Sequence, residues 1–407
     1  MSLSELWREI FGSFSSHGKQ NQQGTTRLTW SPEFMEGAEE LKKRAISLGY
    51  QSDFDGFGNL WITIPGKDKT LSPIYTGSHM DSVPHGGSLD GALGITAGLA
   101  CAAHWKVSGY TPKRTVHVIG FAEEEGTRFG QVCLGSRAIT GDLDEKIAAT
   151  FKTKAGITLE ELRAHAGIKG NPFTPLIDSS GKFLELHIEQ GGILEEDGLS
   201  LGVVSAIVGI RHYTITIEGA ANHAGTTMMN QRHDALVAAS HFIKAIYDRA
   251  LKNNRKYVAT VGQISLVPNA INVVPGSAEL SLELRSEDPE IMDKAEMHAS
   301  STLDEIAALY HVTISMKRTE TIPPLPMNRA LMKTLEQAAK GQSVPYEILP
   351  SWAGHDAMIM GRHMATAMLF VPSIGGISHS PLEKTNEADI EKALSVLDKA
   401  LRELSSQ

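Results

Sequence analysis

Side chains of the types that bind divalent metal ions follow predicted β-strands at widely separated points of the chain. They are His79, Glu125, His187 and His379, and a fifth, Asp90, comes just before a predicted helix. In open α/β sheets, ligands bind outside the carboxyl ends of the strands. Imidazoles and carboxylates without thiolates suit zinc, manganese, nickel or cobalt. The pattern therefore predicts a metal centre at one edge of a sheet.

Two acidic neighbours of these residues could support hydrolytic chemistry. Asp81 lies two residues after His79, so its carboxylate could hold the free imidazole N–H and fix the tautomer. Glu124 precedes Glu125 and could act as the base that moves protons from water to a leaving group. Each motif alone has a plainer interpretation, since most of the 16 histidines would be surface or core residues and an acidic run is usually solvated. Their joint occurrence favours the metal centre.

The elements that must position these residues alternate between strand and helix, which is typical of a mostly parallel sheet covered by helices. In the first part of the chain, patterning predicts helices at 3–14, 33–48 and 92–104, and strands at 60–64, 74–76 and 115–121. The last part of the chain resumes this alternation of helix and strand, with helices at 328–340 and 387–404 and a strand at 366–371. The predicted fold class is α/β, with a mixed, mostly parallel sheet flanked by helices.

The middle of the chain has a different pattern. Strands are predicted at 213–218, 258–267, 278–285 and 312–316, with helices at 234–252 and 291–309. This β-α-β-β-α-β order predicts a ferredoxin-like α+β domain inserted into the first one. Pro323-Pro324-Leu325-Pro326 is interpreted as a stiff return linker. We therefore expect a catalytic domain formed by 1–210 and 324–407 and an inserted domain formed by 211–323.

Composition narrows the classes of function. The chain has 407 residues and a net charge of −9, which argues against nucleic acid or an anionic membrane as a partner. An anionic substrate would need a local cation, and the fork of Arg285 suits a carboxylate, although a surface pair with Glu287 or Asp288 is the plainer interpretation. The two cysteines, Cys101 and Cys133, show no paired spacing, and the N-terminus has no signal-peptide pattern, so a cytoplasmic location is expected.

Several longer motifs carry a resemblance to a known family. They include Gly77-Ser78-His79-Met80-Asp81, Gly86-Gly87-Ser88-Leu89-Asp90-Gly91, Leu186-His187-Ile188-Glu189-Gln190-Gly191, Asn272-Val273-Val274-Pro275-Gly276 and Gly376-Ile377-Ser378-His379-Ser380-Pro381. In the same order along the whole chain, they resemble the allantoate amidohydrolases and N-carbamoyl-L-amino acid hydrolases. These form a branch of the binuclear aminoacylase/carboxypeptidase metallohydrolases.

The resemblance implies two divalent metal ions, a homodimer and roles for individual residues. Asp90 would bridge the metals, His79 and His187 would complete one site, and Glu125 and His379 the other. Glu124 would be the general base and Asp81 the partner of His79. The resemblance also implies substrate contacts, with His223 as a candidate oxyanion stabiliser: Gln190, His223, Asn272, Arg285, Gly354 and His355.

The substrate implied is a ureido acid, with allantoate favoured over N-carbamoyl-L-amino acids. The signs are Thr226-Thr227 after His223, Gly354-His355-Asp356-Ala357, and the segment from Thr26 to Glu33. Trp352 and Met228 depart from the family pattern, and the large ring of Trp352 could reshape the pocket. A metallo-dipeptidase or aminoacylase remains the alternative within the same chemistry, and a binding protein that has lost catalysis is the alternative outside it.

Overall fold

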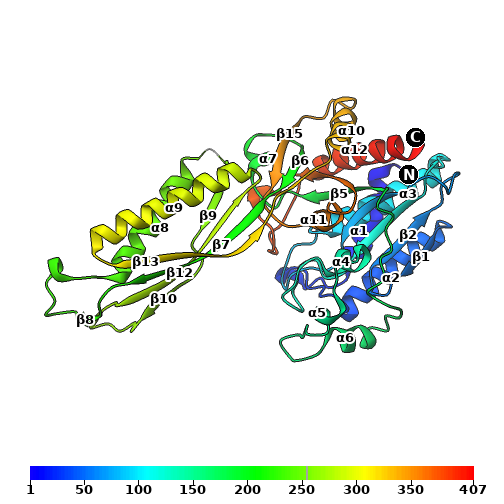
Figure 1. Cartoon of the computed structure of the whole chain (residues 1–407). Coiled ribbons are helices and arrows are strands. Elements are labelled where there is room, and N and C mark those ends of the chain that lie inside the picture. Colours follow the sequence, from blue (N-terminus) through cyan, green and yellow to red (C-terminus); the bar gives the residue numbers. More distant parts are fainter. Residues whose placement is uncertain (254) are drawn as a thin grey trace. The chain divides into compact units, whose positions relative to one another are not determined.

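The chain leaves the larger of its two structural units once and then returns to it (Figure 1). The computed structural model describes residues 1–253 and 255–407. One unit contains residues 1–205 and 327–407, and the other contains residues 206–326. The boundaries expected from sequence lay at 210/211 and 323/324. Among the described residues, no helix is long and apolar enough to cross a membrane.

The larger unit is built on a nine-stranded mixed sheet with the order β1-β2-β4-β3-β5-β16-β6-β14, in which β15 also pairs with β6. The strands are β1 (Gln51–Phe54), β2 (Leu60–Ile64), β3 (Ile74–His79), β4 (Val116–Phe121), β5 (Lys182–Ile188), β6 (Leu201–Ile207), β14 (Leu325–Pro326), β15 (Tyr346–Ser351) and β16 (Ala365–Val371). The central strands β4, β3, β5 and β16 are parallel to one another, and antiparallel strands flank them. The predicted α/β class with a mixed, mostly parallel sheet is confirmed.

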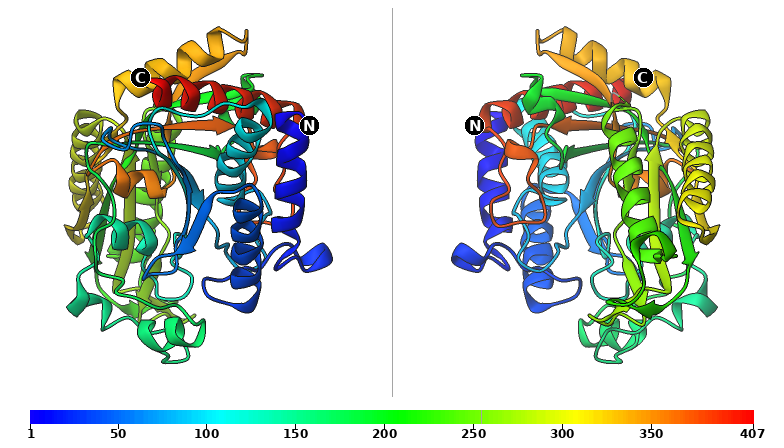
Figure 2. Two further views of the ribbon diagram at one scale, coloured as in Figure 1. Left: turned by 90° about the vertical axis from the view of Figure 1, so that its right-hand side faces the viewer. Right: turned by 90° about the vertical axis from the view of Figure 1, so that its left-hand side faces the viewer.

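Helices cover this sheet and bury its apolar side chains. On one side, α1 (Leu3–Ser16), α2 (Pro32–Ser47) and α3 (Ala92–Ser108) lie side by side (Figure 2). Ser31 caps α2 and Pro32 occupies its first turn, where the missing N–H of proline costs no hydrogen bond. The remaining helices are α4 (Leu134–Thr140), α5 (Glu145–Ala148), α6 (Leu159–His165), α7 (Ile193–Glu196), α10 (Arg329–Lys340), α11 (Asp356–Met360) and α12 (Glu387–Ser406).

Helix α3 is apolar around nearly its whole circumference because it is buried under the sheet. Its glycines allow a very close approach to the strands. A Cβ atom at Gly94 would lie 2.4 Å from the backbone oxygen of Leu186, and one at Gly98 would lie 2.7 Å from the side chain of Val118. The N-terminus of α3 is therefore held directly beneath the ends of β3 and β5, where the predicted ligands lie.

The inserted unit has a five-stranded antiparallel sheet with the order β10-β12-β7-β13, in which β9 also pairs with β12. Its strands are β7 (Gly209–Glu218), β9 (Val258–Thr260), β10 (Ile264–Val267), β12 (Ser277–Ser286) and β13 (Thr313–Ile322). Helices α8 (Ala235–Leu251) and α9 (Pro289–Tyr310) pack on the sheet around a separate core. A short pair, β8 (Asn222–His223) with β11 (Val273–Val274), completes the unit.

Two expectations about strands were wrong. The segment 258–267 was predicted as one strand, but β9 and β10 are separate. Thr260 pairs with Glu283 and Ile264 pairs with Leu280, so one extra residue lies between them, as in a β-bulge. The predicted linker 323–326 is also partly a strand, because Leu325–Pro326 pairs with β6 at the sheet edge, where proline is tolerated.

Candidate metal centre

His79 and His187 are brought together by the register of two parallel strands. Ile74 of β3 lies opposite Lys182 of β5, and the same offset of 108 residues places His79 level with His187. Their Nε2 atoms are 3.4 Å apart. The Nδ1 atom of His187 donates to the backbone oxygen of Ile188 at 2.9 Å, so its Nε2 atom can act as a ligand.

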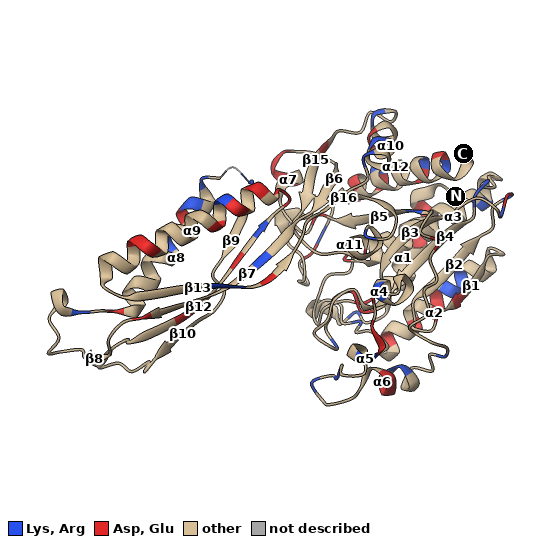
Figure 3. Ribbon diagram, in the orientation of Figure 1, with Lys and Arg blue, Asp and Glu red and all other residues tan. Residues whose placement is uncertain are grey.

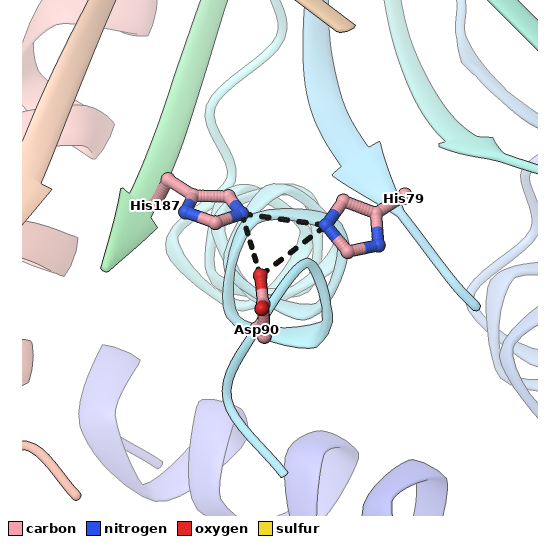
Figure 4. A group of neighbouring side chains, drawn as sticks. All are labelled: His79, Asp90 and His187. Atoms are coloured by element: carbon pink, nitrogen blue, oxygen red, sulfur yellow. Dashed lines mark hydrogen bonds and ion pairs between the residues drawn. The ribbon is translucent and has the colours of Figure 1, made fainter. Parts of the chain in front are cut away.

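Asp90 lies between the two imidazoles, just before α3 (Figure 4). Its Oδ1 atom is 3.4 Å from Nε2 of His79 and 3.1 Å from Nε2 of His187. Gly91 makes this approach possible. It has a φ of +67°, and a Cβ atom there would lie only 2.3 Å from Nδ1 of His79.

The other oxygen of Asp90 faces a second pair of predicted ligands. The Nε2 atom of His379 is 3.1 Å from Oδ2 of Asp90 and 3.5 Å from Oε2 of Glu125. The donor atoms of Asp90, Glu125 and His379 lie within 4.8 Å of one another, as do those of His79, Asp90 and His187. One carboxylate is therefore shared by two groups of ligands, with one oxygen toward each.

Asp81 supports this site differently from the prediction. Its backbone oxygen, rather than its carboxylate, receives the Nδ1–H of His79 at 3.0 Å, while the carboxylate is 3.9 Å away. The carboxylate instead accepts hydrogen bonds from the backbone N–H groups of Glu124 (3.1 Å) and Glu125 (3.2 Å). It turns away from the imidazole because those two N–H groups follow β4 and lack a strand partner there. Asp81 thus links the His79 strand to the acidic turn.

Glu124 lies beside the ligands and is almost fully buried. Burial is the largest cause that raises the pKa of Glu124 well above its usual value, and Glu125 adds to it although His79 opposes it. Oε2 of Glu124 is 4.0 Å from Nε2 of His79, and the thiol of Cys133 donates to Oε1 at 3.5 Å. A carboxylate in this position can take up and return a proton next to whatever the ligands hold.

The donor set fits divalent cations. Oδ1 of Asp90 and Oε1 of Glu125 are buried and have no hydrogen-bond partner among the described residues, which leaves them available to a cation. Burial and the nearby Asp90 raise the pKa of Glu125 to about 7, and the Asp90 contact raises the pKa of His379 to about 9. Burial alone would raise the pKa of Asp90, but the close contacts with His187, His379 and His79 outweigh it and hold the pKa well below its usual value. This crowding of carboxylates favours bound positive charge.

The larger unit holds three of the predicted substrate residues. Gln190 and His355 border this centre, whereas Gly354 is exposed and has no side chain that could reach it. Nε2 of Gln190 donates to Oδ2 of Asp90 at 3.1 Å. His355 packs edge-on against His187, with ring centroids 4.5 Å apart, but it is buried and its Nε2 atom is 2.9 Å from Oγ of Ser351. Gly354 is exposed, and a Cβ atom there would meet nothing within 4 Å.

Glu383 is a residue of the centre that the sequence analysis missed. It is buried, and Oε1 accepts hydrogen bonds from the backbone N–H groups of Leu89 (2.9 Å) and Asp90 (3.1 Å). Oε2 accepts from the hydroxyl of Ser378 at 2.9 Å. Glu383 therefore ties the Asp90 turn to the His379 turn. A glutamate four residues after a predicted ligand was the only available signal.

The predicted substrate residues of the inserted unit fall into two groups. His223 and Asn272 are neighbours, since Val273 pairs with His223 and Ala224 donates to the backbone oxygen of Asn272 at 3.0 Å. Nδ1 of His223 accepts from the backbone N–H of Gly225 at 3.0 Å, so the proton lies on Nε2 of the exposed ring.

Arg285 belongs to the other group. Its guanidinium contacts Glu283 at 2.7 Å, a partner that the sequence analysis did not name. β12 begins at Ser277, next to the β8–β11 pair, and Arg285 lies eight residues further on. At about 3.4 Å per residue, Arg285 is roughly 27 Å along the strand from that end. The structure does not bring it together with His223 and Asn272 within one chain.

Comparisons with known proteins match the whole chain. The model of peptidase family M20/M25/M40 matches residues 75–403. The allantoate amidohydrolase of Escherichia coli (strain K12) is 36% identical over 395 residues, which are 97% of this chain and 96% of that protein. The N-carbamoyl-L-amino-acid amidohydrolase of Paenarthrobacter aurescens is 32% identical and covers 96% of this chain and 95% of its own length.

A solved structure agrees with this likeness. The amidase of the hydantoinase/carbamoylase family from Burkholderia phymatum superposes with a TM-score of 0.89 at 32% identity, covering 99% of this chain and 97% of that one.

Proposed function

Because this chain belongs to peptidase family M20/M25/M40, we propose that it hydrolyses the terminal ureido carbon–nitrogen bond of a ureido acid, with allantoate as the favoured substrate. The chain is a hydrolase that acts on carbon–nitrogen bonds other than peptide bonds, as its nearly full-length amidohydrolase relatives indicate. The alternative substrates are N-carbamoyl-L-amino acids, since relatives with that name match almost as closely.

The observation that carries the proposal is the shared carboxylate of Asp90, with histidines on both sides and Glu124 within reach. His79, Asp90 and His187 would hold one divalent ion, and Asp90, Glu125 and His379 a second. When bound, such ions supply positive charge that polarises a carbonyl group and makes a water molecule more acidic. Zinc, manganese, nickel and cobalt all suit this donor set.

The protein's own groups then move the protons. Glu124 removes a proton from the attacking water and returns it to the leaving nitrogen as the C–N bond breaks. Ammonia leaves, and the carbamate that remains loses carbon dioxide to give the free amine. The amide of Gln190, which contacts Asp90, borders the site where the ureido group would lie.

We also propose that the inserted unit binds the rest of the substrate and forms a homodimer. Arg285 would grip the substrate carboxylate, and His223 would donate its Nε2–H to the oxyanion. Arg285 lies roughly 27 Å along β12 from the strand end beside the His223 pair, on the 3.4 Å rise per residue. The two residues could contact one small substrate only if two copies of the chain contribute. This separation supports the homodimer.

Mixing two inactive variants tests this arrangement. Arg285→Ala and His223→Ala subunits, exchanged at equal amounts, would form about half mixed dimers, each with one intact site, if one substrate needs both side chains from different copies. About a quarter of wild-type activity should then return. No recovery, despite subunit exchange shown by native mass spectrometry, would contradict the shared site but not the metal chemistry.

A substrate screen tests the reaction itself. The holoenzyme, with its metal content measured, is assayed for ammonia release from allantoate and from N-carbamoyl derivatives of glycine, alanine and methionine. A higher kcat/KM for allantoate is expected. Faster turnover of N-carbamoyl-methionine would overturn the substrate, and hydrolysis of dipeptides without ammonia release from any ureido acid would overturn the reaction class.

A further inference from the structure

A basic hollow lies in the inserted unit, between the end of α8, the loop after it and the first turns of α9. Its volume is about 430 Å³, within the range of small-molecule sites. Four cationic side chains line it: Arg249, Lys252, Lys256 and Lys294. No aspartate or glutamate is among the described residues of its lining. Figure 3 shows that elsewhere on α8 and α9 both signs of charge occur.

None of these four cations forms an ion pair with a carboxylate in the part of the chain that the structure describes. Two acids next to these cations in the chain are engaged elsewhere: Asp248 pairs with Lys244, and Asp293 pairs with Arg211. The chain as a whole carries a net charge of −9, so this cluster of four cations without ion pairs is opposite in sign to the net charge of the protein.

Helix stability explains only part of this cluster. Arg249 and Lys252 lie at the C-terminus of α8, where cations interact favourably with the helix dipole. Lys294 has the opposite situation, because it lies in the second turn of α9, near the positive end of that helix. Burial lowers the pKa of His298, which also lines the hollow, and the nearby Arg249 lowers it further. The hollow thus combines like charges with the positive end of a helix.

We propose that this hollow is a binding site for a compact polyanion, a small molecule with two or more phosphate or carboxylate groups. Such a ligand would neutralise Lys252, Lys256 and Lys294 together. Asn253 and Tyr257, which are only partly exposed, could add polar contacts at its side. The site lies within the inserted unit and is separate from the metal centre, which lies in the other unit.

Lysine-specific acetylation followed by mass spectrometry can test this on the holoenzyme. Inorganic pyrophosphate and tricarballylate serve as the phosphate and carboxylate probes, with sodium chloride at equal ionic strength as the reference. Either probe should protect Lys252, Lys256 and Lys294 in a saturable way, and the more effective one identifies the source of charge. Lys317, an exposed residue of β13 in the same unit, should keep its reactivity.

Lysine variants test whether the protection arises from binding in this hollow. The double change Lys252→Gln with Lys256→Gln should weaken the protection of Lys294 about tenfold, because each exposed charge pair contributes up to about fivefold. Lys317→Gln should leave it unchanged. Protection by chloride equal to that by both probes would overturn the site, and so would equal affinity in the double variant. Metal content, measured after each titration, separates binding here from removal of the ions.

Discussion

Removal of the Glu383 carboxylate should weaken metal binding without touching a ligand. In Glu383→Ala, the buried N–H groups of Leu89 and Asp90 lose their acceptor, and the hydroxyl of Ser378 keeps only its longer contact with Asp90. A buried donor left unsatisfied costs about 1–3 kcal/mol, so the two N–H groups together cost about 2–6 kcal/mol. If this cost falls on the ordered Asp90 turn, metal affinity falls at least about 30-fold, since 1.4 kcal/mol is tenfold.

Two matched variants sharpen this prediction. Glu383→Gln keeps a carbonyl oxygen for the two N–H groups, and its amide can donate to Ser378, so its metal affinity should stay within a few fold of wild type. Gly87→Ala should also weaken metal binding, although it leaves Glu383 itself in the sequence. A Cβ atom at Gly87 would lie 2.0 Å from Cδ and Oε1 of Glu383, so the carboxylate must move.

Competition with a chromophoric chelator measures metal affinity, and urea unfolding of the metal-free variants measures how much of the cost falls on the fold. The expected order of affinity is wild type, then Glu383→Gln, with Glu383→Ala and Gly87→Ala well below. The reasoning is refuted if Glu383→Ala binds metal within threefold of wild type and its free energy of unfolding changes by less than about 0.5 kcal/mol, below the usual range for a buried unsatisfied donor.

Three further predictions concern other parts of the larger unit. Glu124→Gln should lower kcat at least about 100-fold while metal content by elemental analysis stays unchanged, and a variant that keeps a tenth of the activity would exclude Glu124 as the base. Gly91→Ala should lose metal, because its Cβ atom would lie 2.3 Å from Nδ1 of His79 at a φ of +67°; normal metal content would show that the turn adapts. Burial lowers the pKa of His117 from 6.5 to about 4, so its neutral form favours folding above pH 6.5 and this stability is lost as the pH falls toward 4. Urea unfolding measures how much stability each protein loses between pH 7 and pH 4. This loss should be about 3 kcal/mol smaller in His117→Gln than in wild type, since one pKa unit is 1.36 kcal/mol. Equal losses in the two proteins would contradict this.

The chemistry of this protein could be read from its sequence because metal ligands are few in type and follow strands. His79 and His187 lie at the ends of two strands and Glu125 lies in the turn after a third, and parallel strands all end at one edge of a sheet. Local periodicity likewise predicted most helices, since an amphipathic face and a capping residue lie within one stretch of chain, as Ser31 and Pro32 show for α2.

Tertiary structure decided what depends on residues far apart in the chain. The register of β3 and β5, which pairs residues 108 apart in the chain, makes His79 and His187 level. The orientation of Asp81 depends on two N–H groups 43 and 44 residues away, and the role of Glu383 depends on a turn 293 residues away. The separation of Arg285 from His223 likewise depends on tertiary structure. His223 pairs with β11, just before β12 begins, and the extended β12 then carries Arg285 away from it.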